Sequence, residues 1–305
     1  MQSFLNYSKI SDASFSGPRL RKQGIMRLPG AGPCDWTMIM TSTGSYDFDA
    51  LNDAAFQTER LRQQAMAVRG IEASILRSAG IQAGHDVLEI GSGPGYVSDL
   101  LSELAPDGSL HAVEPNAALL KQLPANVRKP PARGLFPHQA FGNALPLGDA
   151  SIDFGYARFV LQHVPGPQAV VDEVFRVLRP GGVFCAVDSD DGLVIFHPEE
   201  PRVTQVMQSA QSVQQTQGGD RFIGRKLPEM MQRAGFSSVK AHVMSLTSTE
   251  LPFAVLFNIL LGYKASLLGE SVDATKLYED LAADVAAGRR LVAAGVFIVS
   301  GQKNV

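Results

Sequence analysis

A glycine-rich turn, Gly91-Ser92-Gly93-Pro94-Gly95, follows directly on the segment from His85 to Ile90. That segment predicts a strand, and the spacing of apolar residues from Val97 to Leu104 predicts a helix just after the turn. A strand, a tight turn and a helix are typical of the start of a βαβ unit. This feature constrains the chain more than any other, because it indicates a parallel sheet.

The alternation of strands and helices continues along the next hundred residues. Strands are predicted over residues 109–114, 138–141, 151–157 and 183–187, and helices over residues 117–123 and 167–178. The second of these helices is predicted to end at the turn from Arg179 to Gly182. Val183 to Val187 is wholly apolar, which is typical of a strand buried on both faces. The pattern therefore predicts a mostly parallel sheet with helices on both sides.

After Asp188 the rhythm changes. Helices are predicted over residues 199–217, 227–234, 251–268 and 275–287, and strands over residues 239–246 and 294–300. Before the alternating region, residues 49–78 show helical spacing. Residues 1–48 are rich in Gly, Ser and Pro and predict an irregular segment.

Composition narrows the class of protein. Hydrophobic residues make up 45% of the chain and charged residues 19%, so a packed core is expected. The net charge is −3 and the basic residues do not form a wide surface stretch, which argues against a nucleic-acid partner. The two cysteines and the absence of metal-ligand spacings predict neither a disulfide framework nor a metal site. The longest apolar run, Phe253 to Leu261, is too short to span a bilayer, and we expect a cytoplasmic protein.

The residues around the glycine turn indicate the kind of ligand. Glu114 ends the next predicted strand, 19 positions after Gly95, where an acid can accept hydrogen bonds from a ribose diol. The third glycine comes one position earlier than in the dinucleotide fingerprint, and Pro94 removes an N–H group that a pyrophosphate cradle would use. The turn therefore favours an adenosyl cofactor that carries no phosphate.

The segment from Val87 to Gly95 closely resembles the first motif of class I S-adenosylmethionine-dependent methyltransferases, and Val113 to Asn116 resembles the second. Later motifs of that class are matched in order by residues 143–147, 151–153, 158–164 and 176–182. The resemblance covers roughly Gly70 to Asp188 and is closest to small bacterial enzymes that act on small molecules. It implies S-adenosylmethionine as the cofactor. It also implies a doubly wound α/β, Rossmann-like sheet of seven strands, the last of them antiparallel.

On this basis the chain divides into an irregular segment over residues 1–48, a helical cap over residues 49–80 and a Rossmann-like methyltransferase domain over residues 81–305. Helical insertions are expected at about 192–234 and 250–290 within that domain. The resemblance also implies a set of cofactor-binding residues, namely Glu89, Gly91, Ser92, Gly93, Gly95, Glu114, Pro115, Asn116, Asn143, Ala144, Arg158, Phe159 and His163. Asn143 stands where many relatives carry Asp, but its carbonyl oxygen can still accept a hydrogen bond from the adenine amino group.

Two catalytic candidates follow predicted strands at the ligand edge of the sheet. His163 titrates near neutral pH and could act as a general base, or it could bond the backbone and shape the pocket. Asp188, with Asp190 and Asp191, could orient an acceptor or accept a proton, or it could lie in a solvated loop.

The candidates for contact with the methyl acceptor come from three segments. Tyr46 precedes the first long helix and could close over the cofactor or simply pack. Phe222 and Arg225 lie in a small basic segment, which could hold an anionic acceptor or form a solvated face. Phe253 and Phe257 could form the roof of an apolar acceptor pocket, or pack in the core or at a dimer contact.

We therefore expect a methyltransferase of small-molecule metabolism that acts on an O, N or C atom of a small, rather apolar or specialised metabolite. Whether the chain forms a homo-oligomer stays an open question at this point. One alternative is methylation coupled to cyclisation of a prenyl diphosphate or polyketide chain, which should require an aromatic-lined pocket. Another alternative is binding of S-adenosylmethionine without methyl transfer. A nucleic-acid methyltransferase is disfavoured, because Arg158 to Leu161 replaces the proline-containing motif that such enzymes carry at this place.

Overall fold

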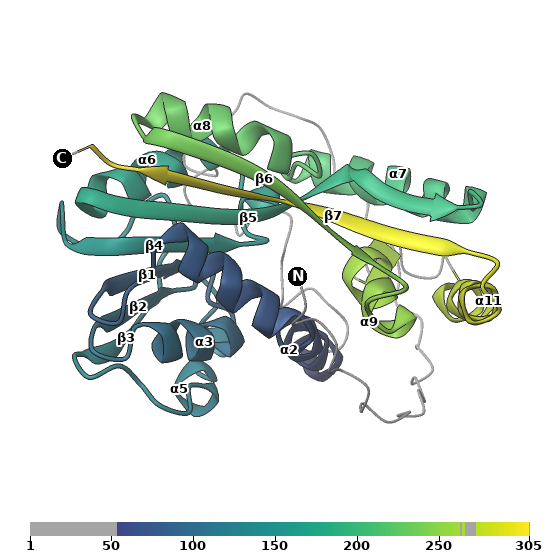
Figure 1. The fold of residues 1–305 in the computed structure, drawn as a ribbon, viewed down its shortest axis with the longest axis horizontal. Helices are drawn as coiled ribbons and strands as arrows, with labels where there is room; N and C mark the ends of the chain where they lie inside the picture. Colours follow the sequence, from purple (N-terminus) through teal and green to yellow (C-terminus); the bar gives the residue numbers. More distant parts are fainter. Residues whose placement is uncertain (1–53, 263, 266–272, 305) are drawn as a thin grey trace, which may run out of the picture. The chain divides into compact units, whose positions relative to one another are not determined.

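A single seven-stranded sheet organises the part of the chain that the structure describes, in the order β3-β2-β1-β4-β5-β7-β6 (Figure 1). The structure is a computed structural model, and it describes residues 54–262, 264–265 and 273–304. Tyr46 and the irregular segment over residues 1–48 lie outside the described residues. No helix in the described ranges is long and apolar enough to cross a membrane.

The first four strands run parallel, as the alternating pattern predicts. They are β1 (Asp86–Ile90), β2 (Ser109–Val113), β3 (Gly134–His138) and β4 (Ile152–Arg158). Helix α3 (Tyr96–Leu104) joins β1 to β2, and the short helices α4 (Ala117–Leu120) and α5 (Leu123–Asn126) lie between β2 and β3. The carboxyl ends of these parallel strands therefore meet at one edge of the sheet, where the glycine turn begins.

Strand β3 begins and ends earlier than the predicted strand at 138–141. It includes Pro137, a residue that lowers strand propensity in a sequence. β3 is an edge strand of the sheet, and a proline is tolerated there because one side of the strand needs no backbone donor.

Strand β5 (Leu178–His197) is much longer than the predicted strand at 183–187. It pairs in parallel with β4 and then continues beyond it, paired antiparallel with β7 (Leu291–Gln302). β7 also pairs antiparallel with β6 (Ser237–Thr247), so the predicted reversal of the last strand is confirmed. The predicted helix-ending turn, Arg179 to Gly182, lies within β5. The register of the pairing between β5 and β4 shifts there, between Leu178 and Val183.

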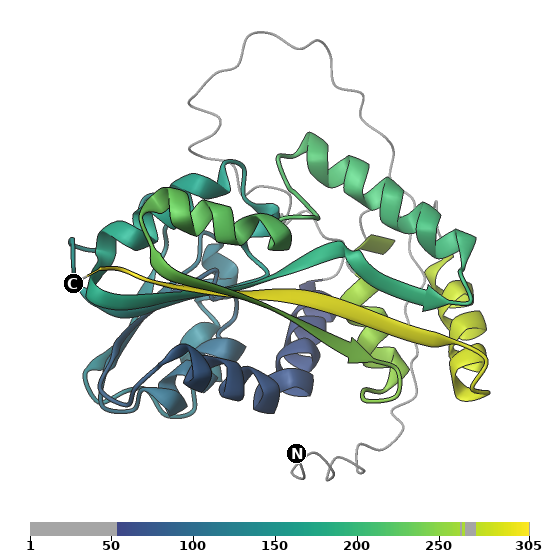
Figure 2. The ribbon, with the colours of Figure 1, turned by 45° about the horizontal axis from the view of Figure 1, so that its top comes forward.

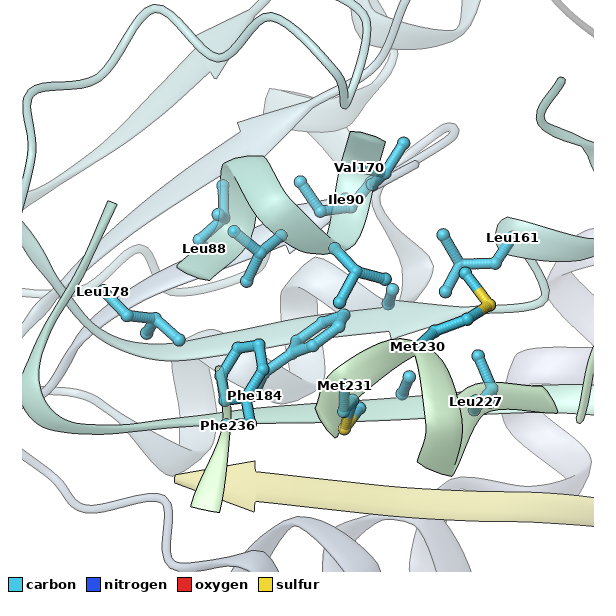
Figure 3. Close-up of a cluster of buried hydrophobic side chains, with 14 of the residues drawn as sticks. Leu88, Ile90, Leu161, Val170, Leu178, Phe184, Leu227, Met230, Met231 and Phe236 are labelled. Carbon is cyan, nitrogen blue, oxygen red and sulfur yellow. The ribbon is translucent and has the colours of Figure 1, made fainter. Parts of the chain in front are cut away.

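Helices cover both faces of the sheet, and neighbouring residues of β1 show why. Val87 packs in the cluster formed with α2 (Ala54–Ala79) and α3, whereas Leu88 packs in the cluster formed with α6 (Pro167–Val177) and α8 (Leu227–Ala234). Figure 3 shows the second cluster, in which Leu88, Val170 and Met231 come from a strand and two different helices. The alternation along β1 is the two-residue period of a strand buried on both sides.

The paired β5, β6 and β7 continue past the parallel strands and form a region that we call the extension. Helix α7 (Pro201–Thr216) lies on one side of it, and α9 (Phe253–Phe257) and α11 (Ala274–Ala286) lie on the other (Figures 1 and 2). The predicted helix at 251–268 is α9 followed by the π-helical turn η3 (Asn258–Gly262). These helices and the far halves of β5 and β7 share a hydrophobic cluster separate from the two clusters on the sheet.

Candidate functional site

A cavity of about 270 Å³ opens at the carboxyl ends of the parallel strands. One end is lined by residues that follow β1 and β2, namely Gly91, Ser92, Gly93, Pro94, Glu114, Pro115 and Asn116. The other end is lined from α2, the β5 segment around Asp191, β7 and η3. Because β4 separates β1 and β2 from β5 and β7 in the sheet, these two ends lie on opposite sides of β4.

The glycine turn is fixed to the sheet by its own backbone. The N–H groups of Gly91 and Ser92 donate to the Val113 carbonyl oxygen at 2.8 and 3.1 Å. Gly91 has φ +68°, and a Cβ atom there would lie 2.4 Å from Cγ2 of Val160. At Gly93, with φ +53°, a Cβ atom would meet no described atom within 4 Å. Gly91 is therefore needed for packing, whereas Gly93 brings bare backbone to an open part of the cavity.

Ser92 supplies a polar group that the described protein does not use. Its Oγ atom is buried and has no hydrogen-bond partner among the described residues. A buried hydroxyl normally has a partner, since an unsatisfied one destabilises the fold by about 1–3 kcal/mol. Because Ser92 lines the cavity, a bound ligand can supply that partner.

Glu114 is held in place by two backbone donors. Its Oε2 atom accepts from Gly93 N and its Oε1 atom from Asn116 N, both at 3.0 Å. Burial raises the pKa of this carboxyl above its ordinary value. The carboxylate has acceptor capacity beyond these two bonds, which suits the two hydroxyls of a ribose.

Glu89 is a second buried acid at the same end of the cavity. It accepts a hydrogen bond from the Ser98 hydroxyl, and burial raises its pKa from 4.5 to about 8. This end therefore carries two carboxyl groups, and no Arg or Lys follows β1 or β2 in the described lining. Such a site suits a ligand that brings positive charge and does not suit a diphosphate.

Arg158 and Phe159 connect the middle of the cavity to helix α2. Arg158 Nη1 lies 3.2 Å from Oε2 of the buried Glu72, and its guanidinium lies 5.1 Å from the centre of the Phe159 ring. Phe159 has φ +54°, a strained conformation for a residue with a side chain. Its N–H donates to the Val187 carbonyl at 2.8 Å, which holds the strained residue on the neighbouring strand.

His163 lies in the short turn η1 (Leu161–His163) and lines the cavity. Burial lowers its pKa well below its ordinary value, and the charges of Arg221, Arg60 and Lys264 lower it further. The imidazole is therefore neutral near pH 7. Its Nδ1 atom lies 3.2 Å from the Nε2 atom of Gln214 on α7.

Asp188, the other catalytic candidate, does not line the cavity. Its carboxylate accepts from the backbone N–H of Gln162 at 3.2 Å and of Ser189 at 2.8 Å, and burial raises its pKa to about 7. It thus fixes the turn that carries His163. Asp188 therefore lies outside the described lining and contacts the cavity only through the residues that it holds.

The segment after Asp188 enters the cavity because β5 is irregular there. Ser189 pairs with Val296 and Val194 pairs with Ala294, so β5 has extra residues between these two pairs. Asp190 and Asp191, in this bulge, both line the cavity. Asp190 pairs with Arg225 at 2.6 Å, and Asp191 pairs with Arg221 at 2.9 Å.

Sequence reasoning missed Lys264, which lines the cavity with only 2% of its surface exposed. It contacts Asp191 Oδ1 at 3.4 Å and donates to the Leu260 carbonyl at 2.7 Å. Burial and the charge of Arg221 lower the pKa of its amine from 10.5 to about 7. A lysine three residues after the apolar run from Phe253 to Leu261 was the available indication in the sequence.

The structure brings together most, but not all, of the residues chosen from the sequence. Eleven of the thirteen cofactor candidates line the cavity, whereas Gly95 and Ala144 do not. Four acceptor candidates also lie outside the lining: Phe222, Arg225, Phe253 and Phe257. Phe253 and Phe257 pack on Tyr278 in the cluster of the extension, and Arg225 stacks on Phe222 at the surface. Ile259 and Leu260, from the same predicted helix as the two phenylalanines, reach the cavity instead.

Comparisons with known proteins agree with this geometry. Residues 88–186 match the methyltransferase domain family. The chain is 33% identical over 176 residues to a probable S-adenosylmethionine-dependent methyltransferase of Mycolicibacterium smegmatis, over 53% of this chain and 64% of that protein. It thus spans less than two thirds of the length of that relative.

Solved structures share the fold at low identity. A phosphoethanolamine N-methyltransferase of Haemonchus contortus, in complex with phosphomonomethylethanolamine and S-adenosylhomocysteine, superposes with a TM-score of 0.56 and 16% identity, over 86% of this chain and 60% of that one. The [4+2]-cyclase SpnF superposes with a TM-score of 0.51 and 15% identity, over 79% of this chain and 83% of that one.

By the family match, residues 88–186 belong to a methyltransferase domain, and the strand order and the glycine turn with Glu114 agree with the class I fold. The resemblance stated from the sequence motifs is confirmed. Domains of this class use S-adenosylmethionine, and the acidic end of the cavity fits that cofactor.

Proposed function

We propose that this protein transfers the methyl group of S-adenosylmethionine to an O, N or C atom of a small molecule. The observation that carries the proposal is the continuity of the cavity. One space reaches from the glycine turn and Glu114 to His163, Asp191 and the apolar residues of η3. A cofactor at the first end and an acceptor at the second would therefore share one enclosed volume.

In the proposed arrangement Glu114 binds the ribose hydroxyls and Ser92 offers its buried hydroxyl to the cofactor. Glu89 holds its proton near pH 7 when the cavity is empty, and it can release that proton to face the positive charge of the cofactor's amino acid portion. When bound, S-adenosylmethionine supplies a methyl group on a positively charged sulfur, which is a good leaving group. The protein then has to align the acceptor with that methyl group and exclude water.

His163 is the proposed general base for acceptors that lose a proton. Its neutral state near pH 7 follows from burial and from the three nearby cations. In the structure, the Nε2 amide of Gln214 donates to Nδ1 of His163. The role requires the opposite amide orientation, in which Gln214 Oε1 accepts the Nδ1 proton, because Nε2 of His163 can then receive the proton of the acceptor. Asp188 would support this role by fixing the η1 turn.

The coupling of methylation to cyclisation is the weaker alternative. It calls for an aromatic wall that stabilises a carbocation. Phe253 and Phe257, which were candidates for such a wall, pack on Tyr278 within the extension. The likeness to a cyclase concerns the fold and does not favour cyclisation here.

The first experiment is calorimetric titration of the full chain with S-adenosylmethionine and S-adenosylhomocysteine. We expect both to bind, and we expect Glu114→Gln to weaken both by about tenfold or more, since the amide loses the charged acceptor for the ribose. Glu229→Gln is the matched control, because Glu229 is 73% exposed on α8 and lies outside the cavity lining. Failure of the unaltered protein to bind either compound would sink the proposal.

The second experiment separates methyl transfer from binding alone. The protein is incubated with S-adenosylmethionine and a panel of small O, N and C acceptors, and formation of S-adenosylhomocysteine is followed. Turnover with at least one acceptor is expected. Tight cofactor binding without turnover on any acceptor class would favour a binding protein instead.

A further inference from the structure

The two ends of the cavity differ in charge. The described lining contains four acids and four Arg or Lys residues. Two of the acids, Glu89 and Glu114, lie at the glycine-turn end, whereas none of the four bases follows β1 or β2. Three of the bases therefore lie on the side of α2, the β5 bulge and η3, whereas the fourth, Arg158 at the end of β4, acts on Glu89.

Three of these bases surround a single space, and we call them the basic wall: Arg60, Arg221 and Lys264. All three line the cavity and are buried, with exposures of 7%, 7% and 2%. Each of them lowers the pKa of His163, so each one acts electrostatically on the same cavity residue. They come from three separate parts of the chain, namely α2, the segment before η2, and the turn after η3.

Among the described residues, the carboxylates nearest to Arg221 and Lys264 do not match the charge of these two bases. Asp190 is paired with Arg225, which lies outside the lining. Asp191 is shared by Arg221 and Lys264, at 2.9 and 3.4 Å. One carboxylate thus faces two buried cations, and burying a charge without full compensation is strongly unfavourable.

We propose that the basic wall binds an anionic group of the methyl acceptor, either a carboxylate or a phosphate, with Lys264 and Arg221 as its principal contacts. Leu61, Ile259, Leu260 and Val194 line the cavity at this end. The acceptor class is therefore a small molecule with an apolar body and one anionic group. This inference rests on the methyltransferase function proposed above and adds the substrate class to it.

The state of Lys264 supports this assignment. With a pKa of about 7, its amine is divided between the charged and neutral forms near neutral pH. An anion beside it would favour the charged form and would supply the charge that Asp191 provides only in part. The bonds from Lys264 to Leu260 and Asp191 already direct its amine into this corner.

The test uses the full chain saturated with S-adenosylhomocysteine, so that the cofactor's own carboxylate is already in place. Three probes of similar size are titrated by calorimetry: benzoate, phenyl phosphate and the neutral benzyl alcohol. We expect benzoate or phenyl phosphate to bind at millimolar concentration or tighter, and to bind better than benzyl alcohol. Comparison of the two anions shows whether the wall prefers a carboxylate or a phosphate.

Two substitutions should act in opposite directions. Lys264→Met keeps the apolar stem and should weaken the anionic probe by about tenfold or more. Asp191→Asn removes the competing carboxylate and should strengthen it. A purely structural role for the pair would make both variants bind more weakly. Lys276→Met is the matched control, since Lys276 is 67% exposed on α11, and it should change nothing.

Binding of S-adenosylhomocysteine shows whether each variant is folded. It also tests the competing assignment, in which the basic wall binds the carboxylate of the cofactor. If Lys264→Met weakens this cofactor product instead of the probe, the basic wall serves the cofactor carboxylate and the inference is wrong. Equal binding of benzyl alcohol and the anions, unchanged binding in Lys264→Met, or no binding of either anion would also overturn it. Should Asp191→Asn lose S-adenosylhomocysteine, Lys264→Met alone decides. The proposed function fails separately, if the unaltered protein binds no cofactor.

Discussion

The glycines of the turn show how neighbouring residues of one motif serve different purposes. The sequence motif treats Gly91 and Gly93 alike, and both have positive φ angles. Of these two glycines, Gly91 is the one where the fold leaves no room for a side chain, since Val160 lies against its backbone. Substitutions at the two positions should therefore fail for different reasons.

We expect Gly91→Ala to destabilise the protein by about 2–5 kcal/mol. The positive φ angle accounts for about 1–2 kcal/mol, and the overlap with Val160 accounts for the rest. Gly93→Ala should lower the free energy of unfolding by only about 1–2 kcal/mol, yet weaken S-adenosylhomocysteine binding because the new methyl group enters the cavity. Urea unfolding and calorimetry measure the two effects. Adding Val160→Ala should recover stability in Gly91→Ala beyond additivity, and simple additivity would contradict the steric explanation.

The buried carboxyl of Glu89 should make stability depend on pH. Its pKa is 4.5 in the ordinary state and about 8 in the folded protein, so between these values the folded state holds a proton that the unfolded chain has released. Stability from this group is present below about pH 4.5 and is lost as the pH rises toward 8. Glu89→Gln should remove a slope of about 1.4 kcal/mol per pH unit from the unfolding free energy. Urea unfolding of both proteins from about pH 5.5 to about pH 7.5 checks this, and parallel curves would refute it.

At the residue scale the sequence predicted the cofactor end far better than the acceptor end. The turn and Glu114 are close in sequence to the strands that position them. Their spacing in the sequence was therefore enough to predict that they lie together at one edge of the sheet. Lys264 and Arg60 reach the cavity only through tertiary packing of α2 and η3, which no local pattern records. The choice between a pocket roof and core packing stayed open for Phe253 for the same reason, because a helical pattern shows an apolar face and not what that face contacts.

Helix α2 is the element that closes the cavity over the middle of the sheet. Its Glu72 accepts from the Tyr156 hydroxyl at 2.5 Å and pairs with Arg158 at 3.2 Å. Both partners come from β4; Glu72 and Tyr156 are buried, and the Arg158 side chain is 10% exposed. A single carboxylate thus connects α2 to the strand that precedes the η1 turn.

Glu72→Gln should destabilise the protein by about 3 kcal/mol, because it leaves the Arg158 charge buried beside a neutral amide. Tyr156→Phe should reduce stability by about 1 kcal/mol, since only one neutral hydrogen bond is lost and the ion pair remains. Denaturant unfolding measures both. Glu103→Gln is the control on α3, where the carboxylate is 59% exposed and a loss below about 1 kcal/mol is expected. Equal losses of unfolding free energy in Glu72→Gln and Glu103→Gln would show that the buried ion pair stabilises the protein no more than an exposed one.

Among the helices and strands, β5 is the element whose length the sequence predicted least well. Its wholly apolar part, Val183 to Val187, was recognised because it is buried on both faces within the sheet. Its continuation to His197 begins with three aspartates, a serine and a glycine over residues 188–192, so this part has the composition of a loop. Antiparallel pairing with β7 makes it a strand, and that partner lies about a hundred residues later in the chain.

The whole described molecule combines two packing regions on shared strands. The parallel strands and their helices form the cofactor end, while the extension has its own hydrophobic cluster and supplies much of the acceptor end. β5 and β7 run through both regions. Such an arrangement lets the acceptor end open locally while the cofactor end stays folded.

Leu256→Ala and Leu101→Ala test this separation, because both side chains are fully buried, one in the extension and one beside α3. Each should destabilise its own region by about 2–5 kcal/mol. In Leu256→Ala we expect faster hydrogen exchange in α9, α11 and the first half of β7, with exchange in β1 and β2 unchanged. Added S-adenosylhomocysteine should slow exchange in β1 and β2 of both proteins. It should not slow exchange in the extension of Leu256→Ala, because a local opening of the extension leaves the ligand bound, and the ligand therefore does not suppress that opening. In Leu101→Ala exchange should rise in β1 and β2 instead. A uniform rise across the sheet in Leu256→Ala would mean that β5 and β7 couple the two clusters into one cooperative unit, and the acceptor end could then open only when the cofactor end unfolds.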